Sequence, residues 1–348
     1  MQKHQEVAPS FEIYRFSKPL RTELKPLLTL DNWHGPLAVA TDWFVIASAV
    51  VLAEFSFWFL PLGILLIGSR QRALASLLHE GAHLVLARAR WLNQTLSEWL
   101  TGYVIFQVYD TYRTSHVEGH HKHLGDPHLD PDLGHYIVCG LYEVRDRHDF
   151  FWKHFVRTVV FLNIPQYLRY LLVHRLGDIW SSRRAFIRLL LTQLTLFSVF
   201  SVTVGWHGYF LYWLLPFLTA FQVIGWLSEI SEHYDLFSKS QSTLTISRNR
   251  FPCLLERAFI GMHGDDFHQT HHLFPLIPFW NLKKAHQVLM QDQNYAAHSA
   301  GVGGILWASK GRRSVLTMIM EDIYRAAPAE TSHIVTERRS TELVGGLK

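Results

Sequence analysis

The chain has 348 residues, a formal net charge of +4, 49% hydrophobic residues and only 18% charged residues. Average globular chains carry about 25% charged residues, so this composition draws attention to long apolar runs. Two cysteines, Cys139 and Cys253, are too few for a disulfide scaffold or a cysteine-based zinc cluster. Basic residues do not interleave with aromatic residues in any patch, and we therefore expect no nucleic-acid partner.

Residues 1–33 are polar and charged, which predicts a cytosolic N-terminal arm with one amphipathic helix and no cleavable signal peptide. Residues 43–68 are apolar except for Glu54 and a break from Pro61 to Gly63. A membrane span needs about 20 apolar residues. The run fits one long span or a tight hairpin from near Leu37. We favour the hairpin because basic residues then flank it on one side of the membrane.

A second apolar block covers residues 187–230 and breaks at residues 205–208. Each half is about long enough to cross a membrane. The turn between the halves carries no Lys or Arg, whereas Arg183 and Arg184 precede the block and Lys239 follows it. The positive-inside rule therefore places the flanking regions, and with them both termini, in the cytosol.

These runs predict an all-α, multi-pass integral membrane protein with about four transmembrane helices in two hairpins and a cytosolic helical cap. Trp99–Tyr109 is apolar but too short to span, which predicts a re-entrant or interfacial segment. Phe150–Leu172 mixes basic and apolar residues, which predicts an amphipathic helix on the membrane surface. The chain divides into an arm (1–33), a membrane domain (34–290) and a cytosolic tail (291–348) with a helix near 314–326 and a disordered end.

Histidine is the commonest metal ligand, and many of the 22 histidines gather in spaced groups. His79 and His83 are four residues apart in an apolar helical context, so both side chains leave one helix face. With Glu80 they also match the HExxH pattern of zinc metalloproteases, in which the glutamate is the general base. This pattern fixes only three positions and is a weak signal by itself.

The second group contains His116, His120, His121 and His123. On an α-helix His116, His120 and His123 share one face, and His121 is displaced by about 100° from His120. Four histidines in so short a stretch are not expected from scattered surface residues. We interpret this group as a source of metal ligands.

The third group, His268, His271 and His272, has the i, i+3, i+4 spacing of a single helical stripe. His233 lies upstream in a Glu-His-Tyr sequence directly after an apolar run, where a ligand and an interfacial residue are both plausible interpretations. A zinc ion needs three or four ligands, so the three groups suffice for two metals. Imidazole ligands with open positions suit iron better than a closed structural zinc site. The neutral ligands leave such a pair electrophilic, which suits attack on an inert C–H bond.

The sequence of HxxxH, HxxxHH and HxxHH boxes, with a Glu-His pair before the last, resembles the membrane fatty acid desaturase and hydroxylase superfamily over about residues 40–290. The resemblance implies an oxidoreductase with two iron ions and O2 as co-substrate. His123 competes with His121 on helical geometry. The ligands implied by position are His79, His83, His116, His120, His121, His233, His268, His271 and His272.

Two branches of the superfamily share features with this chain. The second box and the Glu-His-Tyr sequence are similar to those of alkane hydroxylases. The box at 268–275 and the loop at 125–132 look more like bacterial desaturases, and the loop also resembles rhizobitoxine-type amino-acid desaturases. We expect a desaturase that introduces a C=C bond into an acyl chain or a similar aliphatic substrate, including an amino-acid-derived one. The alternative is a membrane hydroxylase of alkane or lipid type.

The loop acids Asp126, Asp130 and Asp132 have two interpretations. Beside proline they favour turns, and as partners of ligand histidines they would accept the second imidazole N–H. Glu80 and Glu118 are interpreted as such partners rather than as ligands. The choice between turn and partner depends on contacts between distant residues.

Two further classes of function compete with the oxidase. An intramembrane zinc metalloprotease built on the HEGAH sequence would leave most of the clustered histidines unexplained, and a non-enzymatic metal carrier would favour exposed histidine-rich loops. The chain contains no His-Pro-Gly-Gly haem-binding sequence and no dinucleotide fingerprint. An oxidase would therefore take electrons from a separate donor of ferredoxin or cytochrome type.

Overall fold

The computed structural model describes residues 11–180, 182–308 and 311–325, and within these ranges the regular structure is helical, with two isolated β-bridges and no strand. The predicted all-α class is confirmed for this part of the chain. The disordered end predicted for the last residues lies outside the described ranges.

The first apolar run folds as a hairpin rather than as one long helix. α2 (His34–Phe55) and α3 (Leu60–Ala82) are joined by the short η2 (Phe57–Phe59). Pro61 fits the first turn of α3, where a backbone N–H would have no intrahelical partner. Gly63 allows close packing, because a Cβ at this position would lie 3.0 Å from the Cβ of Ala53 on α2.

The second apolar block also folds as a hairpin, and its turn falls where the sequence predicted it. α10 (Arg183–Val204) ends at Gly205, whose φ of +92° suits glycine. The return segment, His207–His233, is helical nearly throughout. Its parts are α11 (His207–Tyr209), η10 (Phe210–Leu214), α12 (Leu215–Leu218) and α13 (Ala220–His233).

Three of the described helices, α2, α10 and His207–His233, are long and apolar enough to cross a membrane. The sequence predicted about four membrane spans. The difference is α3, which is long enough to cross a membrane but not apolar enough over its whole length. Its N-terminal part is apolar, but Ser69, Arg70, Gln71 and Arg72 follow. Ser69 and Gln71 are fully buried against neighbouring helices, so the polar half of α3 packs within the protein.

Trp213 occupies the centre of the apolar bundle. Its ring stacks on Trp43 with 5.4 Å between centroids, and its indole N–H donates to the carbonyl of Val104 at 2.8 Å. Val104 belongs to the stretch 99–109, which forms short helical turns buried against the bundle and does not span. These turns are η3 (Leu96–Gly102) and η4 (Tyr103–Ile105).

The single amphipathic helix predicted over 150–172 is wrong, because the segment is broken near its middle. Phe161 adopts a φ of +64°, and a new helix begins with Pro165 in its first turn. Proline lacks the N–H that a continuous helix would require at this point. The pieces are η7 (Phe151–Val156), α8 (Arg157–Val159), α9 (Ile164–Tyr170) and η8 (Leu171–Arg175).

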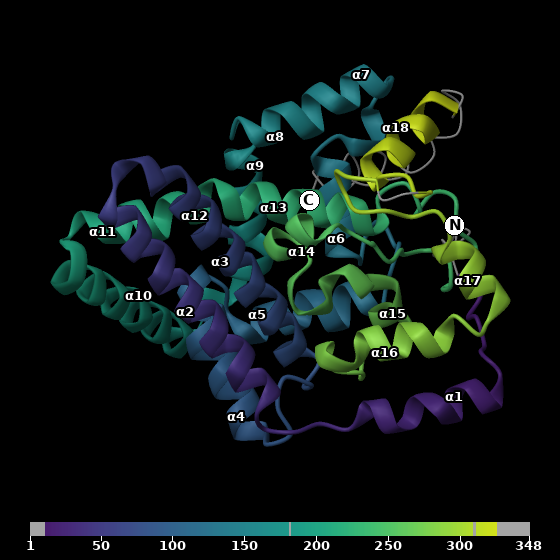
Figure 1. Cartoon of the computed structure of the whole chain (residues 1–348), viewed down its shortest axis with the longest axis horizontal. Helices are drawn as coiled ribbons and strands as arrows, with labels where there is room; N and C mark the ends of the chain where they lie inside the picture. The colour runs from purple at the N-terminus through teal and green to yellow at the C-terminus, as the bar shows by residue number, and fades with distance from the viewer. Residues whose placement is uncertain (1–10, 181, 309–310, 326–348) are drawn as a thin grey trace, which may run out of the picture.

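The remaining helices form a polar part beside the bundle. Leu20 and Leu24 of the arm pack with Leu282 and the fully buried Tyr295, so the described part of the arm lies against residues 282–295. Among these helices are α1 (Lys18–Leu24), α4 (Arg90–Thr95), α5 (Tyr109–Arg113), η5 (Thr114–His121), α6 (Pro131–Val138), α7 (Arg147–Phe150), α14 (Leu254–Phe259), α15 (His268–Leu273), α16 (Phe279–Leu289), α17 (Gln293–Ser299) and α18 (Val315–Arg325). Figure 1 shows α2, α10 and α11 at one end of the molecule and α15, α16 and α17 towards the other.

Candidate metal centre

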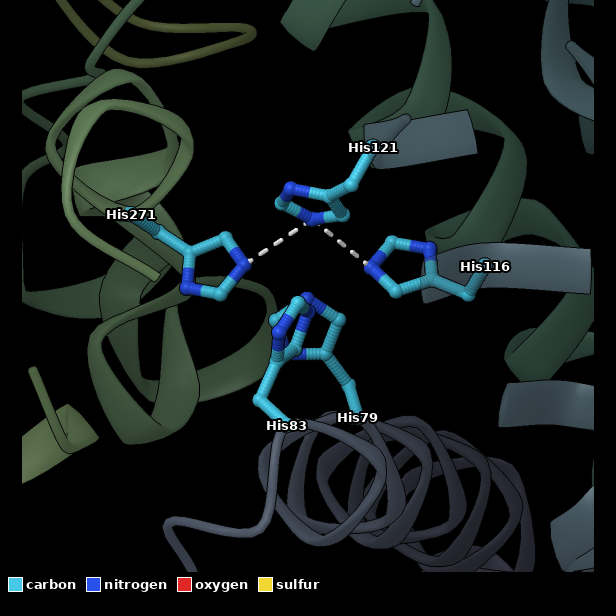
Figure 2. A group of neighbouring side chains, drawn as sticks. All are labelled: His79, His83, His116, His121 and His271. Carbon is cyan, nitrogen blue, oxygen red and sulfur yellow. Dashed lines mark hydrogen bonds between the residues drawn. The ribbon is translucent and has the colours of Figure 1, made fainter. Parts of the chain in front are cut away.

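Nine histidines from four helical segments converge in two neighbouring clusters. In each cluster the potential ligand atoms all lie within 4.8 Å of one another. The first cluster contains His79, His83, His116, His121 and His271, and Figure 2 shows their rings turned towards a common centre. The second contains His120, His233, His268 and His272. The structure thus brings together all nine residues that the family resemblance implied, and it leaves His123 outside both clusters.

α3 presents His79 and His83 because its opposite face is pressed against η3. Gly81 lies between the two histidines, and a Cβ there would come within 1.8 Å of the Ser97 hydroxyl. The side chain of Asn93 fixes this contact by donating to the carbonyl of Gly81 at 2.9 Å. The close approach of η3 therefore sets the direction in which both histidines point.

η5 is a π-helix, and this explains which residues of the second group share a face. In a π-helix the repeating contact is between residues i and i+5. His116 and His121 accordingly meet, with 3.1 Å between their Nε2 atoms. The prediction that His123 shares a face with His116 and His120 assumed α-helical geometry and is wrong, although the rings of His116 and His120 stay stacked at 5.4 Å.

α15 contributes histidines to both clusters. His271 points into the first, with its Nε2 3.2 Å from that of His121. His268 and His272 point into the second, where their Nε2 atoms lie 2.8 Å and 3.2 Å from that of His233. The rings of His272 and His121 stack at 4.3 Å between centroids, so the clusters adjoin one another.

The spacing of these nitrogens fits metal coordination. Bonds of about 2.1 Å from imidazole to a metal place neighbouring ligand nitrogens about 3 Å apart. The closest Nε2–Nε2 pairs within the clusters lie 2.8 Å to 3.4 Å apart, and all candidate ligand atoms of a cluster lie within 4.8 Å of one another. The Nε2 of His83 is buried without a hydrogen-bond partner in the described structure, which is costly unless another group binds it.

Burial keeps most of these imidazoles in the neutral form that binds metals. Loss of hydration is the largest cause, and the neighbouring histidines add to it. Together they hold the pKa of His116, His121, His271 and His272 well below its ordinary value. The pKa of His268 is lowered in the same way by burial and by His233. Neutral nitrogens are the donors that a metal site requires.

Partners outside the clusters orient two of the ligands. Asp130, which is almost fully buried, accepts from the Nδ1 of His120 at 2.9 Å. Burial opposes protonation of His120, but Asp130 and Asp132 outweigh it and raise its pKa to about 9. The Nδ1 of His233 donates to the carbonyl of Ile246 at 2.9 Å. Both contacts leave Nε2 directed into the second cluster.

The loop acids divide between the two interpretations. Asp130 serves both, because it also accepts from the amides of Asp132 and Leu133 at the start of α6. Asp126 accepts from two loop amides, His128 and Leu129, and contributes a turn.

The two glutamates also differ. Glu80 lies 3.4 Å from the Nδ1 of His79 and accepts from the amide of Phe279 at 2.8 Å, as expected for a ligand's partner. Glu118 is instead largely exposed and lies 3.6 Å from Arg113, away from the clusters. His263, a further neighbour in sequence, contacts Asp42 at 2.7 Å and belongs to neither cluster.

Residues that the sequence did not single out line a cavity beside the clusters. The cavity lies between the facing sides of α3 and α13 and includes Arg72 and Glu229. Arg72 follows the first apolar run, and Glu229 lies near the end of the second apolar block. Their common signal in the sequence is helical spacing from a ligand, since Glu229 precedes His233 by one turn and Arg72 precedes His79 by two.

The fold and the histidine clusters define a membrane-type desaturase centre, and comparison with known proteins agrees. The fatty acid desaturase family pattern matches residues 33–302, so the chain belongs to this family. The chain is also similar to dihydrorhizobitoxine desaturase of Bradyrhizobium elkanii, with 35% identity over 320 residues, covering 89% of this chain and 91% of that protein. The resemblance inferred from the histidine boxes is confirmed, and the chain is an enzyme of the desaturase type.

Proposed function

We propose that the chain is an O2-dependent membrane desaturase whose two histidine clusters hold two iron ions. The observation that carries the proposal is the pairing of two buried, all-histidine clusters in a member of the fatty acid desaturase family. Iron bound there supplies the oxidising power, drawn from O2, to remove hydrogen from an unactivated carbon. The protein's own part is to hold nine imidazoles in place, with Asp130 and the Ile246 carbonyl fixing His120 and His233.

The desaturation of an acyl chain or of an amino-acid-derived aliphatic substrate is the reaction we propose, and hydroxylation is the second candidate. The relative is named for dihydrorhizobitoxine, which makes that compound the first substrate to test. We expect a product that lacks two hydrogen atoms and carries no label from 18-oxygen gas, measured by mass spectrometry. A main product that gains one labelled oxygen would establish hydroxylation and leave the oxidase proposal standing.

The other two classes of function find no support in the clusters. A zinc protease built on His79, Glu80 and His83 needs open space at its metal, but three further imidazoles face the same centre. Glu80, the residue that would act as general base, accepts a hydrogen bond from the amide of Phe279. A metal carrier would expose its ligands, whereas His116, His120, His233 and His271 are buried.

We further propose four spans, with α3 as the fourth, and a topology in which both termini and the histidine clusters face the cytosol. Basic residues around the two apolar blocks support this orientation. Electrons then reach the clusters from a separate ferredoxin or cytochrome on the cytosolic side.

This topology can be tested by cysteine labelling of intact cells. A cysteine in place of Trp206, which is 67% exposed in the turn after α10, is expected to react with an impermeant reagent added outside. Cys253 is exposed and provides the control, because it is expected to react only after the membrane is opened. Labelling of Cys253 in sealed cells would contradict the proposed orientation.

A further inference from the structure

The cavity beside the clusters has a mixed lining, in which apolar residues such as Phe221 and Leu171 stand beside charged and amide side chains. It reaches His79, His116 and His233 at the metal side. Its other walls include Arg72, Gln107, Asp132, Arg175, Gln222 and Glu229. Burying an ionisable group beside membrane-spanning helices costs free energy. Proteins that carry such groups usually use them for function.

Several of these side chains lie on the same faces of α3 and α13 as the clustered histidines. On α13, Gln222 and Glu229 lie on the face that ends with His233. At 1.5 Å of rise per residue, Glu229 lies about 6 Å before His233 along the helix axis. On α3, Arg72 lies about 10 Å before His79 by the same measure. A molecule bound between Arg72 and Glu229 would therefore lie within about 10 Å of the clustered histidines along the helix axes.

One cation in the cavity wall is already fully engaged. Arg175 donates to the hydroxyls of Tyr170 and Ser115, and its guanidinium lies 4.7 Å from the ring centre of Tyr112. Asp132 lies 3.9 Å from Arg175 and accepts from Tyr170 at 2.8 Å. These groups form a rigid part of the wall rather than a receptor for a ligand.

Other polar groups of the cavity are buried and lack partners. Gln222 is 3% exposed, yet both its amide oxygen and its amide nitrogen make no hydrogen bond in the described structure. Arg72 is partly satisfied, since its guanidinium donates to the Ser76 hydroxyl at 3.2 Å and lies 3.5 Å from Asp265, but its Nε is buried and unpaired. Glu229 has no side-chain hydrogen bond or ion pair within the ranges described. Native proteins seldom leave such groups unsatisfied unless something binds them.

We infer that this cavity binds a small zwitterionic aliphatic substrate, with Glu229 facing its ammonium group, Arg72 facing its anionic group and Gln222 donating and accepting hydrogen bonds. The inference rests on the proposed function, because it names the substrate class of that desaturase. An acyl chain in the same place would leave the Glu229 carboxylate and the Gln222 amide without partners in an apolar contact. A zwitterion supplies a complement to each of them.

The experiment compares four probes by titration calorimetry on the iron-loaded protein in detergent. The probes are norleucine, which carries both charges, hexanoate and hexylamine, which each carry one, and palmitate. Norleucine is expected to bind at least about tenfold more tightly than any of the others, since each charged group would meet a buried partner. Tighter binding of palmitate, or no binding of norleucine, would overturn the inference.

Two variants show whether the named residues are responsible. Glu229→Gln is expected to weaken norleucine binding at least about tenfold and to leave hexanoate binding unchanged, because only the ammonium partner is lost. Glu321→Gln is the matched control, since Glu321 is exposed and pairs with Arg313 on the surface. Unchanged norleucine binding by Glu229→Gln would contradict the assignment.

The variant Gln222→Met tests whether Gln222 binds the substrate or only supports the fold. Because it removes an unpaired buried amide, this variant is expected to keep or raise the thermal unfolding midpoint while norleucine binding weakens. A lower midpoint with unchanged binding would show that Gln222 only supports the fold and would count against the inference.

Iron content is measured on the same samples. Iron-free protein that still prefers norleucine would refute the proposed function alone, and iron-loaded protein that prefers palmitate would refute only the substrate class.

Discussion

Replacing His121 with alanine is expected to abolish product formation and to lower the iron content of the purified enzyme. His121 lies between the two clusters, with its Nε2 3.1 Å from that of His116 and its ring stacked on His272. Loss of a ligand is expected to cost more than the 10–100-fold typical of losing only a ligand's supporting partner. Product yield and iron per chain, measured on the same preparation, check this prediction.

His123→Ala is the matched control, because it removes a histidine from the same box. His123 is only partly buried and belongs to neither cluster, so activity and iron content are expected to stay near those of the unmodified enzyme. The reverse pattern, with iron lost from His123→Ala and retained in His121→Ala, would show that the second box does not bind metal in its π-helical register.

The variant Asp130→Asn is expected to lower both the iron affinity and the stability of the enzyme. The carboxylate accepts from the Nδ1 of His120 and from the amide of Gly125, both at 2.9 Å, and it caps α6. An asparagine keeps one accepting oxygen but turns an NH2 group towards one of these donors. We expect iron affinity to fall about 10–100-fold. We also expect the free energy of unfolding to fall by about 1–3 kcal/mol, since a buried donor loses its acceptor.

Asp126→Asn separates the two contributions of the loop. Among the described residues the Asp126 carboxylate accepts from the amides of His128 and Leu129, both on one oxygen, and the remaining oxygen of an asparagine can do the same. Its iron affinity is therefore expected to remain within about twofold of the unmodified value, as for a change that leaves His120 supported. Equal losses in both variants, measured by competition with a chelator, would indicate a general role of the loop instead of the contact with His120.

Much of the architecture was predictable because it depends on local patterns. The two apolar runs, their proline and glycine breaks and the i, i+4 pair of His79 and His83 all specify structure within a few residues of themselves. Local patterns were a weaker guide to the number of membrane spans, because they do not show which polar residues are buried against other helices. α3 begins as an apolar helix, and only its tertiary neighbours show why Ser69 and Gln71 are buried in its second half.

The register of the second box could not be predicted from helical periodicity. Spacing alone favoured His123 over His121, because an α-helix was assumed. The π-helical turn of η5 reverses this order. The stripe on α15 posed a related problem, since its regular spacing gives no sign that His271 and His272 belong to different clusters.

Contacts between distant segments account for the rest. Gln269, a neighbour of the ligands on α15, is fully buried and donates to the carbonyl of Leu244, 25 residues away. A substitution there would test the packing of α15 instead of metal binding. Arg72 and Glu229 likewise come together only when α3 packs on α13, which a reading of either helix alone does not reveal.

The central claim is that the nine clustered histidines hold two iron ions, and metal analysis of the purified enzyme tests it most directly. Protein produced with iron and zinc both available, and stripped of loosely bound metal, is analysed by mass spectrometry for metal per chain. We predict about two irons and little zinc, since open all-imidazole sites suit iron and each cluster provides at least four nitrogens. A single tightly held zinc per chain, with no iron, would contradict the account.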